Sequence, residues 1–267
     1  MSVVSFNSVL SAWSHCGVYY PDAPQKAEEL LKLQLDLLES GSLGKSATPD
    51  TQAFSVVIST YARSNLPDKV QQAYRLLQQM LAGVSEGKVL PGKNNVIPFT
   101  GVLNAAAHPS SKSNKGGSDT NNKQSTSTSS AIETPGEDFN TIQSDDDYSI
   151  ALQTYREMKE DVYNIGCKPD HMTFSTMLYV VDAHTQKGSI ERRQMVQTLF
   201  EDACAAGEVS RLVLKALRSV CPDSTLYASL LGSSELAASI KTVDELPRTW
   251  TRNVSQNYRI LKRDHTQ

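Results

Sequence analysis

The chain has 267 residues, a net charge of −3 and 39% hydrophobic residues, which is enough apolar material for a folded core. No apolar run is long enough to span a membrane. The four cysteines lie far apart and form no Cys-x-x-Cys pair, so neither a zinc ribbon nor a disulfide framework is expected. The net negative charge argues against a protein that holds nucleic acid by bulk attraction.

One sequence pattern recurs four times along the chain. A phenylalanine followed by a small polar residue begins a stretch of helix-spaced apolar residues at Phe6, Phe54, Phe99 and Phe174. The apolar residues of each stretch fall on one face of an amphipathic helix. A recurring unit of this size indicates a repeat architecture.

A second helix is predicted after each of these first helices. Proline at the first helical position opens two of them, at Pro24 and Pro67, and apolar-periodic runs follow both prolines. Two further runs of this kind cover residues 150–158 and 195–204. The repeating unit is therefore predicted to be a helical hairpin, and the chain is predicted to be all-α.

The third hairpin is interrupted by a segment of different composition. Serine, threonine, asparagine, glycine and lysine dominate residues 109–130, and acidic residues follow, ending in the aspartates 145–147. Such a segment buries too little apolar surface to offset its ordering entropy, so residues 109–147 are predicted to be disordered. We interpret the aspartates as the negatively charged start of a helix, with a metal site as the minor alternative.

The clearest boundary between hairpins lies just before Phe174. Gly166 suits the left-handed position after a helix end, Pro169 cannot continue a helix, and Asp170 can cap the next one. A capping residue also precedes the second and third copies, at Asp50 and Asn95. The first helices of these copies are thus predicted to begin at capped N-termini.

The pattern becomes degenerate after Gly207. Residues 208–220 are again helical in periodicity but lack the phenylalanine and small polar pair. We interpret residues 223–267 as a C-terminal cap and tail, with Trp250 packed as an anchor.

A basic stripe marks this degenerate part. Residues 208–267 contain nine Lys and Arg against six Asp and Glu, a net charge of +3. Arg211, Lys215 and Arg218 recur on one helical face. This face is either solvated or in contact with phosphate groups.

Residues 164–175 resemble the junction between repeats of the pentatricopeptide repeat family, where a glycine, a basic residue and Pro-Asp precede an aromatic residue followed by Asn, Ser or Thr. The resemblance covers residues 2–207 and continues to about 222. The phenylalanine spacings of 48, 45 and 75 residues exceed the family's unit of about thirty-five, so the additional residues are expected in loops. The resemblance implies an α-solenoid of helix-turn-helix repeats that forms a right-handed superhelix.

This interpretation divides the chain into four parts. Residues 1–108 hold two repeats and the first helix of a third, and residues 109–147 form the insertion. Residues 148–222 complete the third repeat and add a fourth and a degenerate one, and residues 223–267 form the cap and tail.

The resemblance also implies a ligand, single-stranded RNA, with one base recognised per repeat by two side chains. One is the small polar residue after the aromatic residue, and the other is the last residue of the repeat. Carried over to this chain, these positions are Asn7 with Asp50, Ser55 with Asn95, Thr100 with Asp170, and Ser175 without an assigned partner. The family's pairing rules then imply the base order U-A-G.

Other interpretations stay open for the same residues. Asp50, Asn95 and Asp170 stand where helix caps are expected, and small polar residues one turn into a helix can simply face solvent. The alternative function is a protein-binding scaffold of the tetratricopeptide type, whose grooves favour larger aromatic and basic residues. An enzyme is not expected, because residues 223–267 are too short for a nuclease domain, and neither a metal nor another cofactor is expected.

The resemblance further implies a role in RNA processing, stability or translation in mitochondria or plastids. The expected partners of a monomeric protein are RNA and other RNA-processing proteins, with no membrane. The array starts at Met1 without a targeting segment, so we expect further repeats and a targeting peptide upstream.

Overall fold

The computed structural model describes residues 2–16, 19–92, 95–110, 139–221 and 224–259, with the backbone alone for residues 139–145 and for Ser224. Helices provide the regular structure, and no strand occurs within these ranges. The prediction of an all-α fold is therefore confirmed.

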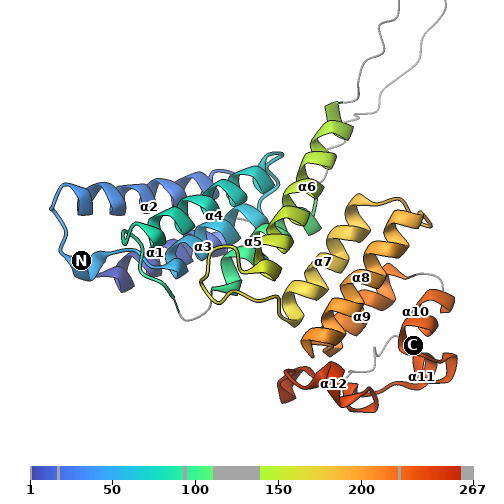
Figure 1. Cartoon of the computed structure of the whole chain (residues 1–267). Coiled ribbons are helices and arrows are strands. Elements are labelled where there is room, and N and C mark those ends of the chain that lie inside the picture. Colours follow the sequence, from blue (N-terminus) through green and yellow to red (C-terminus); the bar gives the residue numbers. More distant parts are fainter. Residues whose placement is uncertain (1, 17–18, 93–94, 111–138, 222–223, 260–267) are drawn as a thin grey trace, which may run out of the picture.

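The main helices form two layers, and successive helices of the chain lie alternately in one layer and in the other (Figure 1). The first helices of the hairpins are α1 (Val3–Cys16), α3 (Thr51–Arg63), α5 (Val96–Ala107), α7 (His171–His184) and α9 (Arg211–Val220). The second helices are α2 (Ala23–Glu39), α4 (Lys69–Ser85), α6 (Phe139–Glu160) and α8 (Ile190–Ala206). Each first helix packs on the next first helix, and each second helix packs on the first helix before it and on the one after it.

Short elements complete the described chain. They are η1 (Lys45–Ala47), α10 (Ser224–Leu231), α11 (Ser234–Ser239), η2 (Val243–Glu245), α12 (Arg248–Thr251) and η3 (Gln256–Tyr258). The elements from α10 onward form the C-terminal segment, which lies next to α8 and α9 (Figure 1).

The repeated phenylalanines occupy one place in their helices. Phe6, Phe54, Phe99 and Phe174 are each the fourth residue of a first helix, and none is more than 5% exposed. In α9 the fourth residue is Leu214, which is also buried. Helix α9 is therefore the fifth helix of the first-helix series. The sequence did not show this, because α9 has leucine where the other four helices have phenylalanine.

The second helices share a common set of buried positions as well. Four buried residues follow one another at intervals of four, four and three residues in each helix. The sets are Ala23, Ala27, Leu31 and Gln34 in α2, Lys69, Ala73, Leu77 and Met80 in α4, Asp147, Ala151, Tyr155 and Met158 in α6, and Arg192, Val196, Phe200 and Ala203 in α8. Ala23, Lys69, Asp147 and Arg192 are therefore structurally equivalent, although one is neutral, two are cationic and one is anionic.

Lys69 uses this position to bind the ends of two first helices. Its ammonium group donates hydrogen bonds to the backbone carbonyl oxygens of Ser64 (3.2 Å), after α3, and of His108, after α5. The last carbonyl groups of a helix lack helical partners and carry the negative end of its dipole. A buried cation satisfies both conditions, even though burial lowers the pKa of the Lys69 amine.

Arg192 likewise binds the C-terminal ends of two first helices, α7 and α9, near the other end of the array. Its guanidinium group donates to the carbonyl oxygens of Thr185 (3.3 Å), after α7, and Val220 (3.0 Å), at the end of α9, and it pairs with the Asp182 carboxylate. Planar guanidinium groups suit such multiple contacts, because their five N–H donors point in fixed directions.

In the third repeat the equivalent residue is Asp147, and a different side chain binds the end of α5. The His184 Nε2 atom lies 2.8 Å from the Ala106 carbonyl oxygen. The Asp147 carboxylate accepts a hydrogen bond from the Gln71 amide (2.7 Å), and burial raises its pKa. A buried carboxylate thus links α6 to α4 where the neighbouring repeats place a cation.

The predicted boundary of the disordered insertion is wrong at its C-terminal end. Residues 139–147 were assigned to the insertion, whereas α6 begins at Phe139 and has 22 residues, against 17 in α4. The aspartates 145–147 were interpreted as the start of this helix, whereas they are the seventh to ninth residues of α6, and Asp147 is only 8% exposed. Residues 111–138 of the predicted insertion lie outside the described ranges.

The C-terminal segment packs on the end of α8. The rings of Phe200 and Trp250 meet edge to face with their centroids 5.7 Å apart, and the Val209 N–H donates to the Trp250 carbonyl oxygen (2.9 Å). Gly207 ends α8 in the left-handed region, with φ at 74°, and its carbonyl accepts from the Asn253 N–H (3.0 Å). Trp250 therefore makes the anchoring contact expected of it.

Replacing Phe174 by alanine is expected to lower the free energy of unfolding by about 3 to 5 kcal/mol, because a buried ring is lost and a cavity remains. Urea denaturation measures this difference. Met172→Ala on the same helix is the control, since Met172 is 39% exposed and its loss should change stability by less than about 1 kcal/mol. Equal effects of the two substitutions would show that α7 is wrongly oriented.

Replacing Arg192 by methionine is expected to cost about 2 to 4 kcal/mol of stability, because Asp182 and the carbonyl groups at two helix ends lose their donor. Methionine keeps a flexible apolar chain of similar length. The exposed neighbour Arg193 provides the matched control, Arg193→Met, for which thermal or urea unfolding should give a change within about 0.5 kcal/mol.

Candidate nucleic-acid interface

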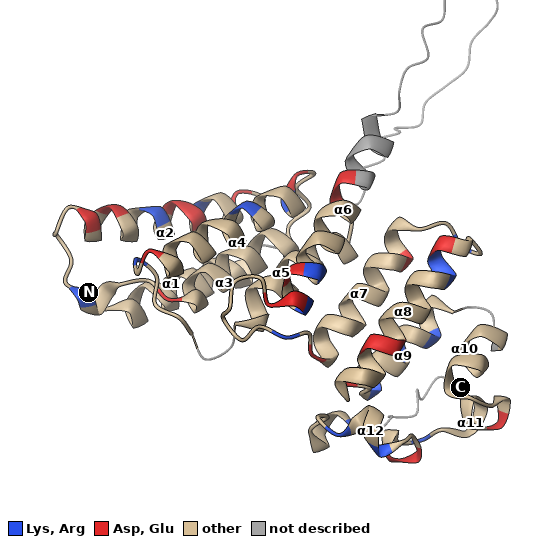
Figure 2. Ribbon diagram, viewed as in Figure 1, with Lys and Arg blue, Asp and Glu red and all other residues tan. Residues whose placement is uncertain are grey.

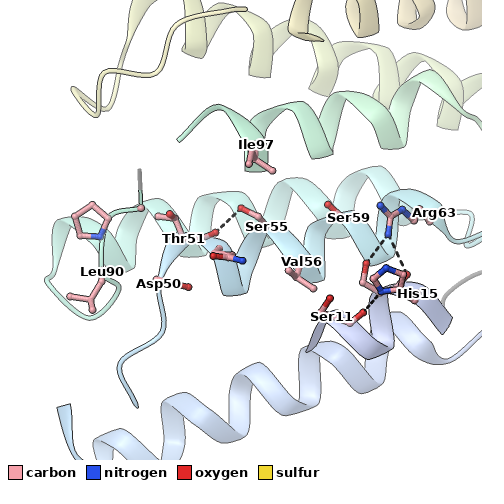
Figure 3. A pocket seen from close by; sticks show the side chains of 14 residues that line it. Ser11, His15, Asp50, Thr51, Ser55, Val56, Ser59, Arg63, Leu90 and Ile97 are labelled. Carbon is pink, nitrogen blue, oxygen red and sulfur yellow. Dashed lines mark hydrogen bonds between the residues drawn. The ribbon is translucent and has the colours of Figure 1, made fainter. Parts of the chain in front are cut away.

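A pocket of about 770 Å³ lies along the first helices of the N-terminal half (Figure 3). Ser11 and His15 come from α1, Asp50 and Arg63 stand at the two ends of α3, and Ile97 comes from α5. Five hydroxyl residues of α1 and α3 also line the pocket, namely Ser11, Ser14, Thr51, Ser55 and Ser59. We call this hollow the groove pocket.

The structure brings the first predicted pair into direct contact. The Asn7 Nδ2 atom donates a hydrogen bond of 3.3 Å to Asp50 Oδ1. The same carboxylate oxygen accepts from the Ala53 N–H (2.9 Å), so Asp50 also caps α3. Within the described part of the chain, Asn7 Oδ1 has no hydrogen-bond partner. Capping of α3 therefore leaves Asp50 in contact with its predicted partner.

The third predicted pair shares one hollow. Thr100 and Asp170 both line a pocket of about 230 Å³, together with Ile97 and Met172. Asp170 caps α7 through the Thr173 N–H (2.9 Å), as the sequence predicts. The 75-residue spacing between the two phenylalanines does not separate this pair, because α5 and α7 pack directly on each other.

The second predicted pair is not brought together. Ser55 lines the groove pocket, whereas Asn95 lines a neighbouring pocket and donates from Nδ2 to the Ile165 carbonyl oxygen (2.9 Å). Asn95 stands just before α5 but makes no capping hydrogen bond, so its predicted role as a cap is wrong. Its side-chain amide instead bonds to the loop that follows α6. The local sequence does not reveal this long-range contact.

The structure identifies Ser210 as the residue equivalent to Asp50 and Asp170 for the first helix that follows α7, which sequence reasoning missed. Ser210 precedes α9 as Asp50 precedes α3 and as Asp170 precedes α7. Its hydroxyl oxygen accepts from the Leu212 N–H (3.1 Å) and caps the helix. Recognition of α9 as a first helix would have identified Ser210, because the residue before each such helix holds the equivalent position.

The fifth residues of three first helices each make the same kind of hydrogen bond to the backbone of their own helix. The hydroxyl groups of Ser55, Thr100 and Ser175 each donate to a carbonyl oxygen of the preceding turn, at 2.6, 3.1 and 2.9 Å. The three residues are buried, at 6%, 7% and 6% exposure. A hydroxyl group that donates to its own helix keeps only its acceptor lone pairs for a ligand.

An exposed apolar residue accompanies these polar positions. Val4, Ile97 and Met172 are the second residues of α1, α5 and α7, and they are 68%, 48% and 39% exposed. Ile97 and Met172 line the pockets beside the predicted pairs. These three residues were not predicted to be functional from the sequence. Exposed large apolar residues at equivalent places provide surfaces for a planar ring.

Two of the three predicted phosphate contacts are engaged by tyrosines. The guanidinium carbon of Arg211 lies 5.7 Å from the ring centre of Tyr258, and that of Arg218 lies 5.3 Å from the ring centre of Tyr227. Lys215 is exposed. The C-terminal segment therefore contacts both arginines of the basic stripe, and Lys215 and Arg218 remain exposed.

Charged residues concentrate on the second helices (Figure 2). Helix α5 has no Lys, Arg, Asp or Glu, and α3 has only Arg63. The Arg63 guanidinium lies at one end of the groove pocket and donates to the Ser14 hydroxyl (2.8 Å). Among the residues that line this pocket, Arg63 is the one lysine or arginine that could contact a phosphate group. It was not predicted from the sequence.

The remaining chemistry of the described residues is limited. No three His, Cys, Asp or Glu side chains among them are grouped to hold a metal ion. Burial raises the pKa of the Cys167 and Cys204 thiols to about 12, so neither forms the nucleophilic thiolate near neutral pH. None of the helices in these ranges has the length and apolarity needed to cross a membrane.

A scan against models of protein families, a search of curated proteins and a search of solved structures each found no match to the chain.

The two members of the first pair are expected to differ in their effect on stability. Asp50→Ala should cost about 0.5 to 2 kcal/mol, because α3 loses its capping acceptor. Asn7→Ala should cost less than about 1 kcal/mol, since it leaves the cap in place. Chemical denaturation of both variants measures the difference. A larger loss for Asn7→Ala would assign Asn7 to the fold and remove it from the interface.

Proposed function

We propose that this chain binds single-stranded RNA sequence-selectively through the faces of its first helices, as a pentatricopeptide-type array. The supporting observation is an arrangement found in two of the three predicted pairs: the fifth residue of a first helix lies beside the residue that precedes the next first helix. One such pair makes a hydrogen bond, Asn7 with Asp50, and another shares a pocket, Thr100 with Asp170. An arrangement that recurs along the array suits a ligand that is itself a linear repeat.

The side chains of each site suit a nucleobase. The exposed apolar residues Ile97 and Met172 offer surfaces for the faces of a ring, and Thr100 and Asp170 offer oxygen acceptors for its edge. Because Thr100 donates its hydroxyl hydrogen to Val96, this site favours a base edge that presents N–H donors. Guanine, with adjacent N1–H and N2–H groups, fits that requirement.

The architecture we propose is an α-solenoid. First helices that stack in chain order, each backed by a second helix, support this arrangement. The right-handed superhelix implied by the resemblance is part of the same proposal. Binding by a monomer in mitochondrial or plastid RNA processing, stability or translation is the proposed setting.

The sparse charge on the first helices shapes the proposed contact. Few cations besides Arg63 are available beside the groove pocket, so base edges contribute more to binding than phosphate neutralisation does. The same sparseness favours the second candidate, a protein-binding helical scaffold, because an uncharged face with exposed Val4, Ile97 and Met172 also suits an apolar peptide. Binding measurements with defined RNA distinguish the two.

Asp170→Asn is expected to change the base preferred at the third position from guanine toward adenine. The amide replaces one acceptor by a donor, and exchange of one recognised edge should shift the preference by about 1 to 3 kcal/mol. Competition among the four U-A-N oligonucleotides measures the ranking. Asparagine is also a good cap, so α7 should remain folded.

Asp68→Asn provides the matched control for this substitution. Asp68 precedes the second helix α4 and makes no capping hydrogen bond, so it lies outside the proposed sites. The ranking should stay unchanged in this variant. An identical ranking for the parent and Asp170→Asn would restrict residue 170 to its capping role, and absence of RNA binding in the parent would favour the scaffold.

A further inference from the structure

Three of the first helices carry polar residues at intervals of one helical turn. Counted from the start of each helix, these are the fifth, ninth and thirteenth residues, which follow one another at i, i+4 and i+8 and therefore share one face. The sets are Asn7, Ser11 and His15 in α1, Ser55, Ser59 and Arg63 in α3, and Thr100, Asn104 and His108 in α5 and directly after it. The fifth residues are the predicted base-reading residues, whereas the ninth residues have no role in that scheme.

The ninth residues line the two pockets of the candidate interface. Ser11 and Ser59 line the groove pocket, and Ser59 and Asn104 line the pocket of about 230 Å³ that also contains Thr100 and Asp170. Each pocket thus holds ninth residues from two neighbouring first helices, and Ser59 belongs to both. We call Ser11, Ser59 and Asn104 the ninth-position row.

The two serine hydroxyls of this row are free to bind a ligand. A hydroxyl group within a helix can donate to a carbonyl oxygen of the preceding turn, as Ser55 and Thr60 of α3 do, at 2.6 and 2.8 Å. Within the described part of the chain, the hydroxyls of Ser11 and Ser59 have no such partner. Both side chains are half-buried, and neither oxygen is sealed from solvent. Each hydroxyl can therefore both donate and accept.

Asn104 offers the same two functions through its amide. Its Oδ1 atom accepts a long hydrogen bond of 3.5 Å from the Thr176 hydroxyl of α7 and keeps a second lone pair. Its Nδ2 atom is accessible and has no partner among the described residues. All three members of the row can thus provide a donor and an acceptor, in contrast to the fifth-position hydroxyls of Ser55 and Thr100, which keep only acceptors.

The order of side chains along α3 matches the order of groups in a nucleotide. Ser59 lies about 6 Å along the helix from Ser55, and Arg63 lies about 6 Å beyond Ser59, since each residue adds about 1.5 Å. Figure 3 shows the three along one side of α3, with Arg63 at the end far from Asp50. In a nucleotide the ribose links the base to the phosphate group. A base at Ser55 with its phosphate group at Arg63 therefore places the ribose at Ser59.

The chemistry of the row suits ribose better than phosphate. Serine and asparagine side chains are uncharged, so they neutralise no phosphate group. The 2′-hydroxyl of ribose is both a donor and an acceptor, and it is the group that distinguishes RNA from DNA. A side chain that can donate and accept satisfies this hydroxyl in either direction.

We propose that Ser11, Ser59 and Asn104 contact the ribose 2′-hydroxyl groups of three successive nucleotides and make the array prefer RNA to single-stranded DNA of the same base sequence. The proposal rests on the proposed function, because base contacts at the fifth positions place the sugars. Ser11 contacts the first nucleotide, Ser59 the second and Asn104 the third.

The test removes one 2′-hydroxyl at a time from a U-A-G RNA. Two further ligands keep the three bases and carry a single 2′-deoxynucleotide, at the middle or at the third position, and NMR titrations of the full chain give the affinities. For the parent protein, each deoxy substitution is expected to weaken binding about 2- to 10-fold, the effect of one hydrogen bond. In Ser59→Ala the middle substitution should lose its effect, because its partner is already absent, whereas the third should keep it.

Asn104→Ala should show the opposite pattern, with loss of the effect at the third position alone. Ser85→Ala is the matched control, because Ser85 is an exposed hydroxyl residue at the end of the second helix α4, and this variant should respond to both deoxy ligands as the parent does. Thermal unfolding of the three variants establishes that they are folded.

The outcomes separate the proposal from the function on which it rests. If the parent binds the RNA and both deoxy ligands equally well, the row does not contact ribose, and the RNA function stands. If Ser59→Ala weakens binding of all three ligands by the same factor, Ser59 contacts another part of the nucleotide and the assignment is wrong. If the parent binds none of the three, the proposed function fails and the proposal fails with it.

Discussion

The arrangement of the helices depends on how the C-terminal ends of the first helices are satisfied. These ends bring together carbonyl groups and negative dipole ends that would repel one another without donors. Lys69 and Arg192 each bridge two neighbouring first helices at this level, and His184 serves α5. Each cation starts from a second helix, so one side chain fixes both the hairpin and its stacking on the next hairpin. The apolar core alone lacks this directional control.

The sequence was sufficient to predict what depends on local periodicity. Helical spacing and the repeated phenylalanine identified four first helices, and Pro-Asp located the caps at Asp50 and Asp170. Features that depend on distant contacts were not predictable. Asn95 has the composition of a cap, but Ile165, seventy residues away, takes its amide. Helix α9 was not recognised as a first helix because leucine fills the phenylalanine position, and the position is defined by burial rather than by aromatic character.

The candidate sites follow the same division. Residue types at fixed places relative to phenylalanine identified the fifth-position hydroxyls, yet their donation to the helix backbone is visible only in three dimensions. This donation changes their chemistry from donor-or-acceptor to acceptor alone, and hence changes which base edges they favour. The basic stripe of α9 shows a similar change, since Arg211 and Arg218 face tyrosines that lie many residues later in the chain.

The contacts at the two ends of the insertion have a consequence for how the chain is connected. The Ser110 hydroxyl donates to the Leu66 carbonyl oxygen (2.6 Å), and the Gln71 amide donates to Asp147 within α6, so the chain before the insertion and the helix after it both contact the second repeat. Helix α6 packs on α4 and α5 independently of the peptide that joins it to α5. The surfaces that meet there therefore belong to parts of the chain that the insertion separates in sequence. A gene divided between Ser110 and Phe139 would encode two fragments with complementary faces, each supplying half of the third hairpin.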